Sequence, residues 1–320
     1  MTNSESHARE NQTILDVFVL VGFSYLNNLQ ILLFMVFLVT YLFTVMGNLL
    51  IILLIQLNLS LHTPMYFFLL NLSLLEICYT TSVFPQLLVH LLVEEKTISI
   101  AGCAAQMYAF SITGLTICFL LAAMAYDRYL AICHPLHYTT ILSGKACAQL
   151  MGASWVIGIS VAGAQTTWLF SQPFCGSNHI QHFFCFARPI EKMVCTDTWK
   201  NLIFGLVLLV LFIMGPFFLI ILSYICIIST ILKLQSAEGR RKAFSTCSAH
   251  LMVVTLLYGT ALLSYLKPSS DSTPGSDQLV SLMYTAVTPA LNPLIYTLRN
   301  KEVKGAFRNT IGKFIFSTMK

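Results

Sequence analysis

The chain has 320 residues, of which 57% are hydrophobic and only 10% are charged, and its formal net charge is +5. A water-soluble protein of this length needs more charged surface than that, so the composition excludes ordinary soluble domains. A lipid bilayer is the natural solvent for such a chain.

Seven apolar runs follow one another, each long enough to cross a hydrocarbon core that takes roughly 20 residues. They predict an all-α membrane protein, a bundle of seven transmembrane helices. The third and seventh runs contain Ser, Thr, Gly and Asn, which indicates that they face other helices or a cavity more than lipid. The runs cover residues 31–57, 65–92, 103–130, 146–168, 201–232, 243–266 and 278–298.

Basic residues favour one side of this bundle. Twelve Lys and Arg residues lie in the C-terminal tail and in the second and third inner loops with their helix ends, against six on the opposite side. The positive-inside rule therefore places the N-terminus outside the cell and the C-terminus in the cytoplasm. The expected organisation is an outer tail (1–30), a transmembrane domain (31–298) and a cytoplasmic tail (299–320).

The two tails carry different signals. No basic region leads into an apolar stretch near the N-terminus, so we expect no cleaved signal peptide. Asn11 begins an Asn-Gln-Thr sequon on the outer side and is the expected glycosylation site. After Asn300, basic residues alternate with apolar ones at helical spacing, which predicts a short amphipathic helix on the inner leaflet. An unstructured basic tail is the alternative.

The ten cysteines divide into two groups by location. Only those on the oxidising outer side are expected to form disulfides, and four cysteines allow three pairings. The others are most simply small buried residues. The outer group is Cys103, Cys175, Cys185 and Cys195, and the other group is Cys78, Cys118, Cys133, Cys147, Cys226 and Cys247.

Six sequence blocks stand where this topology requires them, and together they resemble the olfactory receptor branch of the rhodopsin-like (class A) G-protein-coupled receptors. The resemblance runs from about Gly22 to Lys301. The blocks are Gly47-Asn48, Leu61 to Leu69 (LHTPMYFFL), Met124 to Cys133 (MAYDRYLAIC) with His134 to Tyr138, Ser223-Tyr224, Lys242 to Leu251 (KAFSTCSAHL) and Pro289 to Asn300 (PALNPLIYTLRN).

This resemblance implies a Cys103–Cys185 disulfide and a second disulfide between Cys175 and Cys195. It also implies an odorant pocket in the outer half of the bundle, coupling to a stimulatory G protein that raises cyclic AMP, and a place in the plasma membrane of olfactory cilia. The expected partners are a small odorant, the heterotrimeric G protein and the bilayer, with no nucleic acid. Two positions depart from the family pattern: Glu76 stands where Asp is usual, and Phe186 follows Cys185 where an acid is usual.

A cytoplasmic switch is expected at the end of the third span. About 25 helical steps, or roughly 38 Å, separate Cys103 from Arg128, so this helix crosses the whole membrane. Asp127 can restrain the Arg128 guanidinium until the sixth span moves outward, although a helix-end Arg also snorkels to headgroups without any such role. The predicted switch residues are Asp127, Arg128, Tyr129, Tyr224, Asn292, Pro293 and Tyr296.

Glu76 is the one acid placed deep in a span, and burying it is expensive unless it is protonated or paired. Asn48 and Asn292 are its expected neighbours. The cluster is predicted to hold a proton, water or sodium, and a protonated Glu76 satisfied by hydrogen bonds is the open alternative. No other cofactor, no metal cluster and no catalytic arrangement is expected, so the chain is not predicted to be an enzyme.

The predicted ligand pocket uses one stripe of each helix in the outer half of the bundle. Such stripes are also typical of plain helix packing. They contain no acid or base, so a charged ligand would lack a partner and the expected ligand is neutral. The residues are Phe110, Ser111, Gly114, Leu115, Cys118, Phe186, Leu208, Phe212, Tyr258, Ala261, Leu262, Tyr265, Leu282 and Thr285.

Two rival functions share a polytopic, apolar sequence. A transporter or channel often shows repeated halves, and no repeat is evident here. A peptide or amine receptor of the same fold is the nearer alternative. The amine case would require an acid on the outer half of the third span, where this chain has Phe110, Ser111 and Gly114.

Overall fold

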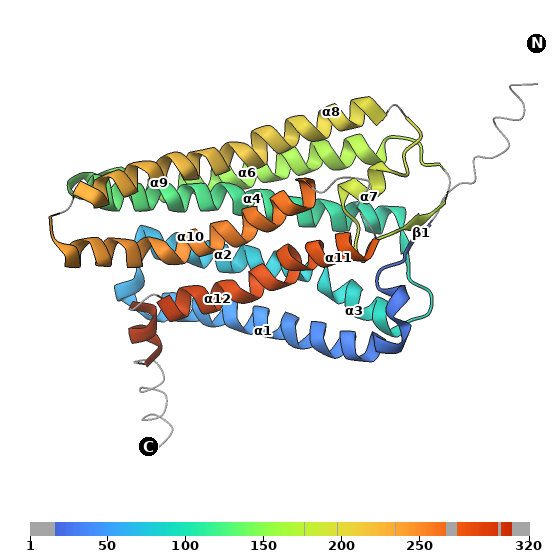
Figure 1. Cartoon of the computed structure of the whole chain (residues 1–320), viewed down its shortest axis with the longest axis horizontal. Coiled ribbons are helices and arrows are strands. Elements are labelled where there is room, and N and C mark those ends of the chain that lie inside the picture. The colour runs from blue at the N-terminus through green and yellow to red at the C-terminus, as the bar shows by residue number, and fades with distance from the viewer. Residues whose placement is uncertain are drawn as a thin grey trace, which may run out of the picture.

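The computed structural model describes residues 17–175, 177–196, 198–233, 235–266, 274–299 and 302–308. Among these residues, seven helical segments are long and apolar enough to cross a membrane, which confirms the predicted bundle. They run along the long axis of the molecule (Figure 1). The segments are α1 (Gln30–Leu57), α2 with α3 (Pro64–Thr81 and Phe84–Leu92), α4 (Ile100–Cys133), α6 (Gly144–Phe170), α8 with α9 (Thr198–Leu208 and Gly215–Lys233), α10 (Ala237–Leu266) and α11 with α12 (Pro274–Leu282 and Thr288–Arg299).

Three of these spans are interrupted. The second span breaks where α3 begins beside Pro85, whose nitrogen has no hydrogen to donate to a helical ladder. A π-helical turn, Leu209–Met214, joins α8 to α9, and the amide of Gly215 donates to the carbonyl oxygen of Val210, five residues back. A second π-helical turn, Met283–Val287, joins α11 to α12. These wider turns shift which residues of the fifth and seventh spans face the bundle interior.

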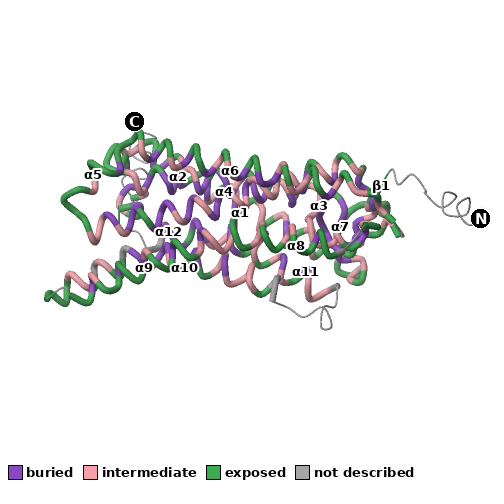
Figure 2. Tube along the Cα trace, turned by 90° about the horizontal axis from the view of Figure 1, so that it is seen from above, coloured by how far each residue is buried: buried purple, intermediate pink, exposed green. Residues whose placement is uncertain are grey.

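The central helix is α4, which packs against α2, α6 and α9. Buried residues lie where the helices face one another and exposed residues lie on the outside (Figure 2). Gly158 of α6 lies so close to α4 that a Cβ atom there would meet the Thr116 hydroxyl and would lie 3.0 Å from the carbonyl oxygen of Ile112. A small residue is therefore required at this crossing, as is common where membrane helices approach closely.

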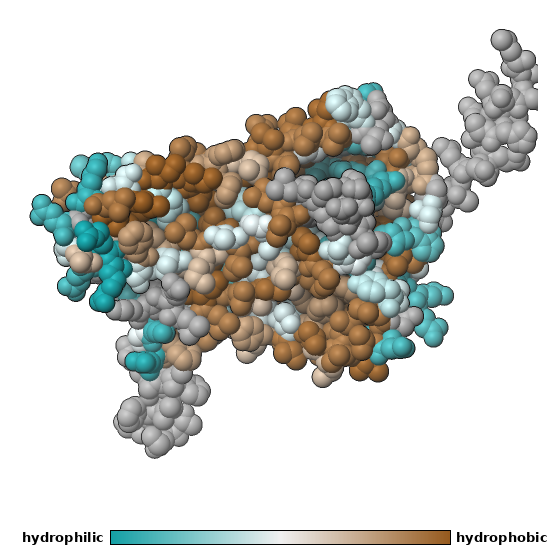
Figure 3. All heavy atoms as spheres, viewed as in Figure 1, coloured by the Kyte–Doolittle hydropathy of each residue, from teal (hydrophilic) through white to brown (hydrophobic). Residues whose placement is uncertain are grey.

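The outside of the bundle is apolar around its middle. Val210, Leu211 and Leu222 are more than half exposed. Hydrophobic residues cover the middle of the molecule, and hydrophilic residues gather toward its two ends (Figure 3). An apolar surface of this extent fits a lipid environment rather than water. Cys78 and Cys226 are exposed as well, so the expectation that the cysteines outside the outer group are all buried is wrong for these two.

A short β-sheet stands at the outer end of the bundle. β1 (Val17–Leu20) lies between β2 (Thr97–Ser99), to which it is antiparallel, and β3 (His179–Ile180), to which it is parallel. Phe18 on β1 is fully buried. The sheet ties residues 17–20 to the first and second outer loops, so part of the segment expected to be a tail is folded.

The cytoplasmic end carries two short helices, α5 (Tyr138–Ile141) and residues 302–308. In the second of these, Val303 and Ala306 are buried in the bundle's core cluster. The Tyr66 hydroxyl donates to Oε2 of Glu302 at 2.6 Å, which fastens this helix to α2. The predicted amphipathic continuation through 309–320 lies outside the described residues.

The close crossing of α4 and α6 can be tested by adding one methyl group. Gly158→Ala should lower the free energy of unfolding by about 1–3 kcal/mol, because it overpacks a closed contact. A Cβ on Gly152, in the same helix, would meet no atom within 4 Å. Gly152→Ala is the matched control and should be neutral or stabilising by up to about 1 kcal/mol. Thermal unfolding of the purified protein measures both, and equal transition temperatures would contradict this packing.

Candidate functional site

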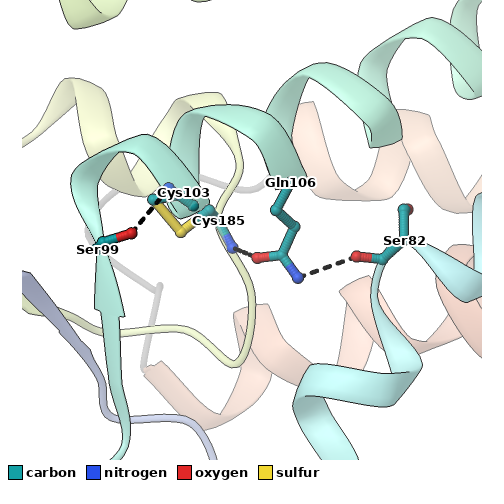
Figure 4. Close-up of a disulfide and its surroundings, with 6 residues drawn as sticks. Ser82, Ser99, Cys103, Gln106 and Cys185 are labelled. Atoms are coloured by element: carbon teal, nitrogen blue, oxygen red, sulfur yellow. Dashed lines mark hydrogen bonds between the residues drawn. A yellow bond between two sulfur atoms is a disulfide. The ribbon is translucent and has the colours of Figure 1, made fainter.

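The second outer loop is fastened to the top of α4 by a disulfide between Cys103 and Cys185, with 5.4 Å between the Cα atoms. Gln106, one turn further along α4, binds the same loop (Figure 4). Its Oε1 accepts from the backbone amide of Cys185 at 2.9 Å, and its Nε2 donates to the carbonyl oxygen of Ser82 at 3.0 Å. Gln106 therefore joins α4, the loop and the break between α2 and α3.

A second disulfide, Cys175–Cys195, closes the loop on itself. A polar network lies beside it at the tops of α6 and α8. The Trp168 indole and the Gln172 amide both donate to Oδ1 of Asn201 at 2.9 Å. Both disulfides are the pairs that the family resemblance implied. The outer ends of the fourth and fifth spans are thus held together by side-chain hydrogen bonds.

Aromatic side chains of this loop fill the outer bundle between α1, α3, α4 and α11. Phe184 is fully buried, and its ring centroid lies 4.9 Å from that of Phe110 on α4 and 5.1 Å from that of Phe186. Phe110 in turn stacks on Tyr79 of α2 at 4.7 Å. The loop forms an apolar lid whose rings reach the predicted ligand stripe of α4.

His182 fastens the lid to the seventh span. Its Nε2 lies 3.1 Å from the Ser281 hydroxyl, which also accepts a hydrogen bond of 2.8 Å from the Tyr284 hydroxyl. The imidazole stacks on Phe183 with 4.5 Å between centroids. Burial lowers the pKa of His182 to about 3, although a backbone hydrogen bond at Phe184 acts in the opposite direction. The side chain is therefore neutral at physiological pH and acts as a hydrogen-bonding clasp.

The predicted ligand stripes of α4 and α10 meet at one point. The Tyr258 hydroxyl on α10 donates to the carbonyl oxygen of Cys118 on α4 at 3.5 Å, and its ring stacks on Phe217 of α9 at 4.7 Å. A Cβ on Gly114 would lie 3.5 Å from the ring of Tyr79. Tyr258 thus joins the third, fifth and sixth spans.

The remaining predicted pocket residues are less closely connected. Thr285 is buried, and its hydroxyl donates to the carbonyl oxygen of Ser281 within its own span at 2.8 Å. Leu282 and Phe186 both pack against the hydrophobic cluster that contains Phe183 and Phe184. The Tyr265 side chain lies outside the described part of the chain. The half-buried residues are Phe110, Ser111, Gly114, Leu115, Phe186, Leu208, Phe212, Ala261, Leu262 and Leu282.

At the cytoplasmic end, the predicted switch residues Asp127 and Arg128 are both buried. Oδ1 of Asp127 accepts a 2.7 Å hydrogen bond from the Tyr138 hydroxyl of α5, and Nη2 of Arg128 contacts the sulfur of Met65. Burial raises the pKa of Tyr138, and the neighbouring carboxylate raises it further, so the phenol stays protonated and able to donate. The contacts of the Asp-Arg-Tyr segment therefore include the second inner loop and α2.

His250 links three spans just above this segment, and it was not among the predicted switch residues. Its Nδ1 lies 2.9 Å from the Tyr224 hydroxyl of α9, and its Nε2 lies 3.1 Å from the carbonyl oxygen of Leu121 on α4. The sequence feature that could have identified His250 is a histidine within an apolar run of the sixth span, inside the KAFSTCSAHL block. Tyr296 is buried, and its hydroxyl has no hydrogen-bond partner within the described residues.

Glu76 lies in the middle of the bundle with the neighbours that were expected. Nδ2 of Asn292 donates to its Oε1, and Asn48 also hydrogen-bonds to the carboxyl group. Oε2 of Glu76 and Oδ1 of Asn292 are buried acceptors without a partner among the residues that the structure describes.

Comparison with known proteins agrees with these features. The family model described as olfactory receptor matches residues 37–313. Human olfactory receptor 10A4 is 53% identical and the alignment covers 96% of this chain and 98% of that protein; human olfactory receptor 10A7 is 51% identical over 94% and 96%. The crystal structure of squid rhodopsin aligns with a TM-score of 0.66 at 18% identity, covering 90% of this chain and 87% of that one.

A seven-helix bundle with a disulfide-tied lid at one end and an Asp-Arg-Tyr segment at the other defines a membrane protein of the rhodopsin fold. Within that class the chain belongs to the olfactory receptor family. It is an odorant-sensing G-protein-coupled receptor that crosses the plasma membrane several times, and it is not an enzyme.

The lowered pKa of His182 makes a prediction about stability. Below about pH 6.5 the unfolded chain binds a proton on this imidazole, whereas the folded protein binds it only near pH 3, so stability is lost as pH falls through this window. As the pH falls through this window, the unfolding free energy of the wild type should decrease by up to about 1.4 kcal/mol per pH unit more than that of His182→Gln. His179→Gln, which changes an exposed histidine of the same loop, is the control. Equal slopes in the wild type and His182→Gln, measured by thermal unfolding, would contradict the buried clasp.

Proposed function

We propose that this receptor binds small, neutral, mostly apolar volatile molecules in the outer half of the bundle. In response it activates a stimulatory G protein of the olfactory type, which raises cyclic AMP. The observation that carries the ligand class is the chemistry of the predicted pocket, whose residues include no Asp, Glu, Lys or Arg. A charged ligand there would lose its hydration without gaining a partner.

The lid supports the same ligand class. The ring of Phe184 lies against Phe110 of α4 and stacks on Phe186 in the same loop. A mostly apolar enclosure with a few hydroxyl groups is typical of sites for small organic ligands. Ser111 and Tyr258 are the side chains that we assign to orient a ligand's oxygen atom.

Signal transfer is assigned to α10, which is held to α4 at two carbonyl oxygens. The Tyr258 hydroxyl hydrogen-bonds to the carbonyl oxygen of Cys118, and the His250 ring hydrogen-bonds to the carbonyl oxygen of Leu121. The two side chains are about 12 Å apart along the helix axis. A ligand that displaces Tyr258 therefore acts on the same helix whose cytoplasmic end must move to free Arg128 for the G protein.

Glu76 is assigned a proton or a sodium ion in the resting receptor. The support is the pair of unpartnered buried oxygens described above, on Glu76 and Asn292. A proton would let the carboxyl group donate to Asn292, and sodium would be held by the two oxygens directly. Either species removes the cost of an uncompensated buried carboxylate.

The test is a cyclic AMP assay in cells that display the receptor, run against a chemically diverse panel of volatile compounds. We expect neutral compounds to raise cyclic AMP in the wild type and none to do so in Arg128→Ala at matched surface expression, because that variant lacks the cytoplasmic switch. Silence of the wild type across the panel, or an undiminished response in Arg128→Ala, would contradict the proposal.

A further inference from the structure

Lys96 occupies an unusual place at the outer rim, between a groove and a small internal cavity. The groove has a volume of about 670 Å³ and a mixed lining. Its apolar residues include Val19, Val21, Leu92 and Val93, and its polar residues are Ser24, Gln30, Glu94, Lys96 and His179. The internal cavity measures about 10 Å³, which is room for about one water molecule. Lys96 therefore borders both a groove of mixed polar and apolar lining and a small, mostly apolar cavity.

His90 lines the internal cavity together with Lys96. It is 9% exposed, and its Nδ1 finds no hydrogen-bond partner among the described residues. The ring hydrogen-bonds to the backbone of Thr97, which leaves Nδ1 as an acceptor with a free lone pair. A buried imidazole lone pair thus shares a one-water cavity with a primary amine.

The Lys96 ammonium is only lightly held. Its Nζ donates to the Ser24 hydroxyl at 3.2 Å, which is a neutral partner. Burial lowers the pKa of Lys96, so more of the amine is in its neutral, nucleophilic form than for a solvated lysine.

We propose that Lys96 and His90 form a carbonyl-capture site, at which odorants that carry an aldehyde group bind reversibly as imines of the Lys96 amine. The nitrogen lone pair adds to the carbonyl carbon, and a proton passes from nitrogen to oxygen to give a carbinolamine. Loss of the hydroxyl group as water then forms the carbon–nitrogen double bond. One amine and one aldehyde yield one imine and one water, with no oxidant or reductant.

His90 serves as the base for this exchange. Its Nδ1 accepts the proton from the attacking nitrogen through a water molecule in the cavity and returns it to the departing hydroxyl group. The apolar residues of the groove, Val19, Val21, Leu92 and Val93, receive the hydrocarbon chain, which raises the local concentration of aldehyde beside the amine. The site lies at the rim and is separate from the pocket between α4 and α10.

Reductive trapping tests the proposal on the intact receptor in cell membranes. Octanal with sodium cyanoborohydride converts each imine to a stable secondary amine, and peptide mass spectrometry locates it. We expect Lys96 to be labelled about 100-fold faster than Lys192 and Lys200. This factor is the lower end of the rate acceleration that a positioned general base contributes. Both of those lysines are exposed on the same side of the membrane. Labelling of Lys96 at the rate of these two would overturn the capture site, and this comparison needs no variant.

Two variants separate the roles of the residues. His90→Gln keeps a polar side chain without a base and should lower the rate at Lys96 by about 100-fold; an unchanged rate would overturn the assignment of His90. Lys96→Arg keeps the positive charge, should abolish the labelled peptide and should leave labelling at Lys192 unchanged. Because the readout is a covalent label, the result of this test does not depend on any cyclic AMP response.

Discussion

The fixed position of α4 is the constraint on which the rest of the receptor depends. Its outer end is bonded covalently to the lid through Cys103 and Cys185, and its cytoplasmic end is held to the second inner loop through Asp127 and Tyr138. Between these ends, Gly158 allows α6 to pack without a gap. A helix anchored at both ends serves as the reference against which another helix can move, and α10 is joined to it by side-chain packing and hydrogen bonds.

Much of the fold could be predicted from the sequence because the bilayer imposes it. Any run of about 20 apolar residues must satisfy its backbone internally, so the spans and their order follow from hydropathy. The outer sheet could not be predicted in this way. Val17–Leu20 is short, and its partners Thr97–Ser99 and His179–Ile180 are distant in sequence, so its pairing depends on how the helices bring the loops together.

Some residues of the candidate site could likewise be predicted from the sequence, and others could not. Glu76 and Asn292 could be placed together because a buried carboxyl group needs a polar neighbour and few were available. His250, His182 and Tyr138 were missed as functional groups, since each acts through a contact from another span or loop that no spacing reveals. The π-helical turn Met283–Val287 also changed the phase of the seventh span, and Thr285 bonds to its own helix.

We propose that a ligand in the outer bundle moves α10 relative to α4. This movement is tested most directly by the distance between spectroscopic probes on Thr139 of α5 and Arg241 of α10, both exposed at the cytoplasmic end. Pulsed electron resonance on the purified receptor, with and without an agonist found in the volatile panel, gives this distance. We expect a longer distance with agonist, and an unchanged distance with an agonist that raises cyclic AMP would contradict the movement of α10.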